Sequence, residues 1–139
     1  MKAQLRKEIQ GVFNRLALSF DKKDVSGVVA SVLPDAVILY LDATAMPIQK
    51  WRAGAKADFS ATQSMRSKFK VDKVEPAGKN AMAWYTETHD YVFKGDKKLR
   101  YCSLNKWSAV LTKTSKGWKI RYFVQLFEAI KVIEFKNKK

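Results

Sequence analysis

Residues 9–36, IQGVFNRLALSFDKKDVSGVVASVLPDA, hold two stretches with helical spacing on either side of a short polar break. Apolar residues of the first stretch recur at steps of three and four, which is the spacing of one face of an α-helix. They are Leu5, Ile9, Val12, Phe13, Leu16 and Phe20. Asp24 can accept a bond from a free backbone N–H, which predicts a second helix starting there. Its apolar stripe is Val25, Val28, Val29, Val32 and Leu33, and Pro34 ends it because proline cannot donate the helical hydrogen bond.

The remaining sequence predicts one more helix followed by strands. A third helix is expected from about Ile48 to Met65, with Trp51, Ala55 and Phe59 on one side. Strands are expected at residues 35–41, 68–76, 81–93, 100–113 and 118–130, with turn residues such as Gly95 and Gly117 between the later ones. Helices followed by a meander predict an α+β class, with helices on one face of a curved, mainly antiparallel sheet. The length of 139 residues suits one domain.

Composition excludes several classes of site. The net charge is +14, but the basic residues are scattered and accompany no nucleic-acid-binding motif, so no specific nucleic-acid partner is expected. The single cysteine, Cys102, and the single histidine, His89, predict neither a disulfide nor a metal site, and we expect no cofactor. No apolar run reaches the length of a membrane span. The first residues lack the apolar core of a secretion signal, which weakly favours the cytoplasm and leaves a signal removed before this N-terminus as the open alternative.

Three segments carry a resemblance to the nuclear transport factor 2-like superfamily, in its SnoaL-like and steroid delta-isomerase-like branches. They are Ile9-Gln10-Gly11, FDKKDVSGVVASVLPDAV at residues 20–37, and GWKIRYFVQLF at residues 117–127. The resemblance covers nearly the whole chain and implies one SnoaL-like domain at residues 1–139. It also implies a cystatin-like layout, in which a cone-shaped sheet curls around three helices in the N-terminal half. An apolar pocket at one end and a homodimer formed through the sheet would follow.

The resemblance also allows a test for steroid-isomerase chemistry. Isomerases of this superfamily use a tyrosine, an aspartate base and a protonated aspartic acid; the last is a known example of a carboxylic acid kept neutral by an apolar site. In this sequence the three positions fall on Leu16, near Tyr40 and close to Trp107. None of these can repeat its counterpart's role, so the usual catalytic set is not intact.

Strand alternation determines which other side chains could enter the pocket. By resemblance, the even-numbered residues of 81–93 face the pocket, while Glu87 and His89 lie on the opposite side; a β-bulge would exchange the two sets. Asp90 and Tyr40 are the best catalytic candidates, although a partly solvated rim carboxylate paired with Lys or Arg is the favoured alternative for Asp90. The full set expected to contact a ligand is Leu16, Phe20, Tyr40, Trp51, Phe59, Met82, Trp84, Thr86, Thr88, Asp90, Asn105, Trp107 and Gln125.

Three functions are consistent with the sequence. The leading hypothesis is a protein that binds a small molecule of apolar or mixed polarity. The second is a cyclase, isomerase or dehydratase that uses Asp90 for proton transfer and Tyr40 to polarise a carbonyl group. The third is a pocketless module that interacts with a protein partner through its basic surface and its sheet.

Overall fold

The computed structural model describes residues 2–134, which form three helices and six strands. The helices are α1 (Lys2–Asp21), α2 (Val25–Ala30) and α3 (Ile48–Ala61). The strands are β1 (Val32–Leu39), β2 (Ala45–Pro47), β3 (Thr62–Ala77), β4 (Asn80–Phe93), β5 (Asp96–Thr114) and β6 (Gly117–Glu134). The predicted α+β class is confirmed.

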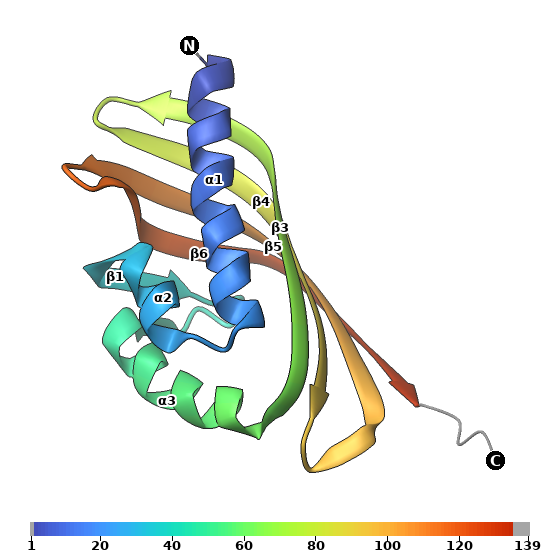
Figure 1. Cartoon of the computed structure of the whole chain (residues 1–139). Helices are drawn as coiled ribbons and strands as arrows, with labels where there is room; N and C mark the ends of the chain where they lie inside the picture. The colour runs from blue at the N-terminus through green and yellow to red at the C-terminus, as the bar shows by residue number, and fades with distance from the viewer. Residues whose placement is uncertain (1, 135–139) are drawn as a thin grey trace.

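The six strands form one sheet in the order β2-β1-β6-β5-β4-β3. Only β1 and β6 run parallel, and every other pair is antiparallel. All three helices lie on one side of this curved sheet, and β4, β5 and β6 extend past them at one end (Figure 1). Below, the face of the sheet toward the helices is called the inner face, and the opposite face the outer face.

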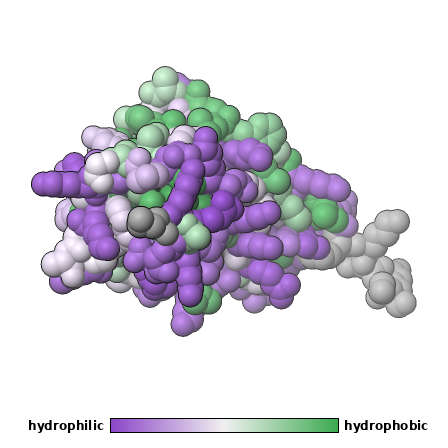
Figure 2. All heavy atoms as spheres, turned by 90° about the horizontal axis from the view of Figure 1, so that it is seen from above, coloured by the Kyte–Doolittle hydropathy of each residue, from purple (hydrophilic) through white to green (hydrophobic). Residues whose placement is uncertain are grey.

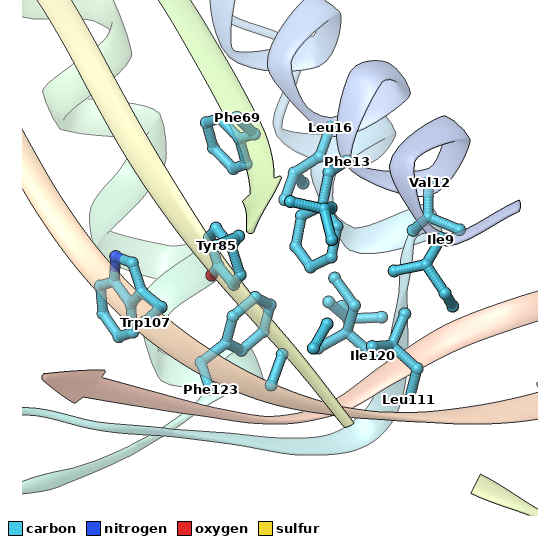
Figure 3. Close-up of a cluster of buried hydrophobic side chains, with 14 of the residues drawn as sticks. Ile9, Val12, Phe13, Leu16, Phe69, Tyr85, Trp107, Leu111, Ile120 and Phe123 are labelled. Atoms are coloured by element: carbon cyan, nitrogen blue, oxygen red, sulfur yellow. The ribbon is translucent and has the colours of Figure 1, made fainter. Parts of the chain in front are cut away.

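Helix α1 packs its predicted apolar stripe against the inner face. Ile9, Val12, Phe13 and Leu16 are each no more than 2% exposed. The ring of Phe13 lies against Tyr85 on β4, with ring centroids 4.2 Å apart, and Figure 3 shows this contact beside Phe69. Ala81 and Ala83 are completely buried on the same face of β4, because their small side chains fill the space that α1 leaves against the sheet.

Helix α2 is shorter than the sequence predicts. Its N-cap is Asp24, as expected, whose carboxylate accepts a bond from the N–H of Gly27 at 3.1 Å. The helix ends at Ala30, and the predicted helical residues Val32 and Leu33 begin β1 instead, where Val32 pairs with Ile120. β-branched residues fit a pleated sheet well. Pro34 lies where the β1–β6 register shifts, so its missing N–H interrupts no regular ladder there.

Helix α3 is also shorter than predicted. It ends at Ala61, and residues 62–65 belong to β3, where Thr62 pairs with Phe93 and Met65 with Tyr91. Thr62 is buried and donates its hydroxyl to the backbone oxygen of Asp58 at 2.7 Å. Residues 62–65 therefore pair with the long strand β4 and do not form the last helical turn of α3 that the apolar spacing alone predicts.

Candidate functional site

A cavity of about 250 Å³ lies between the helices and the inner face of the sheet. Most of its wall is apolar, and the residues come from all three helices and five strands. These wall residues are Leu16, Phe20, Val28, Ile38, Ile48, Trp51, Phe69, Tyr85, Trp107 and Phe123. An engineered apolar cavity of about 150 Å³ holds benzene, so this cavity has room for a molecule of one or two rings.

The cavity continues into an open groove at the end of the sheet that the helices do not cover. Phe20, Trp51, His89, Asn105 and Glu128 line both spaces. The groove, of about 400 Å³, adds a second set of mainly apolar side chains, among them Phe59, Met65, Tyr91, Phe93 and Ile130. A ligand therefore has a route from solvent to the cavity along the inner face.

One end of the cavity is polar and centres on Glu87. Oε1 of Glu87 lies 3.3 Å from Nε2 of His89, and it accepts bonds from Nδ2 of Asn105 at 3.2 Å and from Nε1 of Trp107 at 3.4 Å. The side chains of Glu87 and His89 are only 13% and 12% exposed. These contacts hold one carboxylate oxygen in place. Within residues 2–134, no side-chain or backbone donor reaches the other oxygen, Oε2.

The polar end extends in two directions across the sheet. On one side, Nδ1 of His89 is hydrogen-bonded to Oγ of Ser67 at 2.7 Å. On the other side, Nε2 of Gln125 donates to Oδ1 of Asn105 and to Oε2 of Glu128, both at 3.0 Å. These bonds satisfy groups that would otherwise be costly to bury beside an apolar wall.

The loop after β1 is held against this polar end. The N–H of Leu41 donates to Oε1 of Gln125 at 3.2 Å. The adjacent Tyr40 places its ring near Trp107, and its hydroxyl has only a weak contact with Sδ of Met46 at 3.9 Å. Burial, and then the charge of Glu87, raise the pKa of Tyr40, so its hydroxyl keeps its proton and is a hydrogen-bond donor toward the cavity.

The prediction for the faces of β4 is wrong. Glu87 and His89 line the cavity, while five of the predicted contact residues point to the outer face: Met82, Trp84, Thr86, Thr88 and Asp90. No bulge causes the exchange, because β4 pairs with β5 without interruption from residue 80 to residue 91. The odd-numbered side must face the helices, since Ala81, Ala83 and Tyr85 are buried in the core cluster that contains the apolar face of α1.

Asp90 is a partner of Arg100 on the outer face. Nε of Arg100 donates to Oδ1 of Asp90 at 2.6 Å, and Sγ of Cys102 lies 3.1 Å from the same oxygen. The hydrogen bond from Arg100, and then that from Cys102, lower the pKa of Asp90 to about 2. Its proposed role as an acid or base in the cavity is therefore wrong, and the alternative is correct in its arginine partner, although Asp90 lies on the outer face and not at the rim of the cavity.

The other predicted contact residues lie where a ligand could reach them. Seven line the cavity: Leu16, Phe20, Tyr40, Trp51, Asn105, Trp107 and Gln125. They include all three positions compared with the steroid isomerases. Phe59 lines the adjoining groove. Because Trp84 points outward and Trp107 stands in the wall, neither ring fills the cavity, which argues against a pocketless module.

Sequence reasoning missed part of the lining. The residues not predicted are Val28, Ile38, Ile48, Phe69, Tyr85, Glu87, His89, Phe123 and Glu128. Ala81 and Ala83 were the available signal for the β4 face, because two small residues at alternate positions indicate the side on which a helix packs closely. Within residues 2–134, the structure has no group of three or more His, Cys, Asp or Glu residues that could hold a metal ion. Over the same residues, no helix is long and apolar enough to cross a membrane.

Comparison with known proteins gives one family and many structures of the same fold. Residues 9–125 match the family model of the SnoaL-like domain. A nuclear transport factor 2-like superfamily protein from Salmonella enterica serovar Typhimurium superposes with a TM-score of 0.71 at 16% identity, covering 100% of this chain and 96% of that one. No curated protein matches the sequence.

Two further solved structures are similar. A ketosteroid isomerase-like protein from Erwinia carotovora has a TM-score of 0.69 at 13% identity, covering 86% of this chain and 93% of that one. A conserved protein from Planctomyces limnophilus has a TM-score of 0.78 at 11% identity, covering 91% and 95%. At such low identity, these likenesses establish the fold alone.

Proposed function

Because this chain belongs to the SnoaL-like domain family, within the nuclear transport factor 2-like superfamily, we propose that its cavity binds a small, mainly apolar molecule with at least one polar group. The observation that carries the proposal is the cavity itself, whose wall is apolar on most sides and polar at Glu87. Sites for small molecules commonly combine an apolar lining with a few placed polar groups. The apolar wall would supply affinity, and the polar end would orient the molecule.

Filling the cavity tests this proposal. Indole and 2-naphthol are probes of one or two rings, and their binding is measured by isothermal titration calorimetry. Leu16→Trp places a larger side chain in the wall, and Leu18→Trp makes the same change on the same helix at a side chain that is 56% exposed. We expect Leu16→Trp to weaken binding tenfold or more and Leu18→Trp to leave it unchanged.

A second variant protects this test against a folding failure. Ile38→Phe enlarges a side chain on the opposite wall, and it is used if Leu16→Trp does not fold. If the folded variant binds both probes as tightly as the unmodified protein, or if neither probe binds to the unmodified protein, the proposal is wrong.

The free Oε2 of Glu87 favours a second candidate function, which is proton transfer. A carboxylate that is fixed through one oxygen and open at the other can remove a proton from a bound molecule. His89 is less suited to direct contact with a substrate, because both ring nitrogens already face protein partners, Ser67 and Glu87. Tyr40 could donate a hydrogen bond to a carbonyl oxygen while the proton moves.

Proton exchange measures this second function without a known substrate. A small ketone such as 1-indanone is incubated with the protein in heavy water, and loss of its α-protons is followed by NMR. A role for Glu87 predicts that the unmodified protein and Asp90→Asn exchange the α-protons faster than buffer alone. Glu87→Gln should exchange them only at the buffer rate. Exchange that is equal in all three proteins rules that role out for this substrate class.

We also propose that the protein pairs through the outer face of its sheet. Apolar side chains from β4, β5 and β6 adjoin one another there: Met82, Trp84, Leu104, Val110, Tyr122, Val124 and Phe127. Tyr122 and Phe127 are 42% and 47% exposed. Figure 2 shows hydrophobic residues gathered along one edge of that view, with a largely hydrophilic surface elsewhere. An apolar patch of this kind on a soluble protein indicates an interface.

Sedimentation equilibrium tests the pairing. Phe127→Asp should shift the mass from that of two chains to that of one. Leu18→Asp, an equally exposed apolar residue on α1, should not. A single-chain mass for the unmodified protein would contradict the proposal.

A further inference from the structure

The charge of the cavity is opposite to the charge of the protein. The sequence has 27 Lys and Arg residues against 13 Asp and Glu residues. Among the described residues that line the cavity and its groove, three are carboxylates, Asp58, Glu87 and Glu128, and none is Lys or Arg. The Lys and Arg side chains of the described residues thus lie outside this cavity and its groove, although they line other pockets of the surface.

Glu87 is the carboxylate placed deepest in this space. Its three partners, His89, Asn105 and Trp107, all approach Oε1. An ionised carboxylate has about four acceptor sites, so these contacts leave Oε2 with unused capacity. No Lys or Arg within the described residues forms an ion pair with Glu87, whereas Asp90 on the outer face has Arg100. The inner carboxylate therefore lacks the Lys or Arg partner that its outer neighbour has, and its basic neighbour is His89, at 3.3 Å.

Aromatic rings stand beside the carboxylates. Phe20 and Trp51 meet edge to face with ring centroids 6.0 Å apart, and Tyr40 and Trp107 do so at 6.2 Å. All four of these rings line the cavity. The face of an aromatic ring carries negative charge and attracts a cation. Carboxylates and ring faces together favour a positively charged group that is attached to an apolar body.

The net charge of +14 does not cancel this preference. At physiological ionic strength, interactions between exposed charges are screened beyond about 8 Å, and buried charges are screened much less. The lysines that produce the net charge are mostly exposed, whereas Glu87 is 13% exposed and adjoins the cavity directly. The local carboxylate therefore outweighs the distant basic surface.

We propose that the cavity selects a small amine in its protonated form, and that Glu87 is the residue that determines this choice. Oε2 of Glu87 accepts a hydrogen bond from the ammonium group, Glu128 at the entrance adds a second negative charge, and the aromatic wall holds the apolar body. A carboxylate of the same size is repelled by Glu87 and Glu128. This inference rests on the proposed function, because it names the chemical class of the molecule that the cavity binds.

Three probes of nearly equal size separate charge from shape. They are 2-phenylethylamine, 2-phenylethanol and phenylacetate, which carry a positive, a neutral and a negative group on the same ring. Affinities are measured by calorimetry at about pH 8, where an alkylamine, like a lysine side chain with a pKa of about 10.4, is protonated. We expect the amine to bind at least tenfold more tightly than the alcohol, and phenylacetate to bind most weakly.

Substitutions then assign the preference to a residue. Glu87→Gln keeps the shape and removes the charge, so the affinity for the amine should fall about tenfold while that for the alcohol stays the same. Glu87→Asp keeps the charge and should retain part of the amine preference. Glu75→Gln is the matched control, because Glu75 is a carboxylate on β3 that pairs with Lys2 away from the cavity.

The outcomes distinguish this inference from the proposed function. If the alcohol binds as tightly as the amine, the cavity binds small molecules and the amine preference is wrong. If the amine preference survives in Glu87→Gln, the role of Glu87 is wrong. If none of the three probes binds although indole or 2-naphthol does, the amine inference fails and the proposed function stands; if indole and 2-naphthol do not bind either, both fail. Should Glu87→Gln not fold, Glu128→Gln replaces it, with a smaller loss of amine affinity expected.

Discussion

The inner face of the sheet has two halves that differ in packing, although the same strands build both. Near the start of β4, Ala81, Ala83 and Tyr85 are at most 2% exposed and belong to the same core cluster as Phe13 and Leu16 of α1, with Tyr85 at its border with the cavity. Four residues further along the same face, His89 borders a cavity and an open groove. We call the first part the closed half and the second the open half. Helix coverage separates them, because the strands continue beyond the end of α1.

The difference shows how one sheet can serve both stability and binding. In the closed half, rings and aliphatic side chains fill the space between α1 and the sheet (Figure 3). In the open half, polar side chains form hydrogen bonds with one another and leave the cavity and the groove unfilled. Buried polar groups that are mutually satisfied are tolerated beside an apolar wall. The closed half therefore determines stability, and the open half is available for binding.

The largest expected effect compares one aromatic residue from each half. Phe13→Ala removes a fully buried ring from the closed half and should lower the free energy of unfolding by about 3–5 kcal/mol. Trp51→Ala removes a partly exposed ring that borders an existing cavity, and we expect less than half of that loss. Urea unfolding followed by circular dichroism measures both values. An equal or greater loss for Trp51→Ala would remove the distinction between the halves.

A second prediction uses pH to probe the closed half. Burial, and then the charge of Glu87, raise the pKa of Tyr85 well above its ordinary value of about 10. Above pH 10 the unfolded chain loses this proton while the folded chain keeps it, so the stability from Tyr85 is complete below about pH 10 and declines above it. In that range, Tyr85 lowers the free energy of unfolding by at most about 1.4 kcal/mol for each pH unit.

Replacement of this tyrosine isolates its contribution. In Tyr85→Phe the alkaline decline should be shallower than in the unmodified protein, as measured by urea unfolding between about pH 9 and pH 11. Tyr122→Phe, at an exposed tyrosine on the outer face, is the control and should follow the unmodified protein. Identical alkaline profiles for Tyr85→Phe and the unmodified protein would show that Tyr85 is not sealed in the closed half.

The smallest expected effect concerns the outer face. The bond from Arg100 lowers the pKa of Asp90 to about 2, so this pair contributes stability above the ordinary aspartate range near pH 4, and the contribution is lost as the pH falls to 2. Because Asp90 and Arg100 are 36% and 41% exposed, Asp90→Asn should cost no more than about 1 kcal/mol at neutral pH. Binding of indole should not change. Weaker indole binding in Asp90→Asn would place Asp90 in contact with the cavity after all.

The fold could be predicted from the sequence because its signals are local. The spacing of Ile9, Phe13 and Leu16 specifies α1, and Asp24 specifies the start of α2. The ends of α2 and α3 could not be predicted in the same way. Val32 and Thr62 leave their helices because they pair with Ile120 and Phe93, which are distant in sequence. Tertiary pairing overrides local preference at such ends.

The site was predicted in part, and the error has an identifiable cause. Residues directly opposite each other in antiparallel strands project to the same face. Asn105 pairs with Glu87, and Trp107 pairs with Tyr85. Expecting Asn105 and Trp107 in the pocket therefore required Glu87 there as well, and excluded Asp90. This register depends on how the turn at residues 94–95 closes, and turn residues alone do not specify it.

The single parallel contact in the sheet has a consequence for how the protein is made. Leu39 lies beside Val124, so the strand that carries Ile38 joins the rest of the sheet through β6, and its other neighbour is the short strand β2. The chain must therefore be synthesised through β6 before that wall can close. Contacts between such distant segments also slow folding. A nascent chain that stops after β5 would lack Phe123 and Gln125, so the wall of the cavity is assembled only once β6 has joined the sheet.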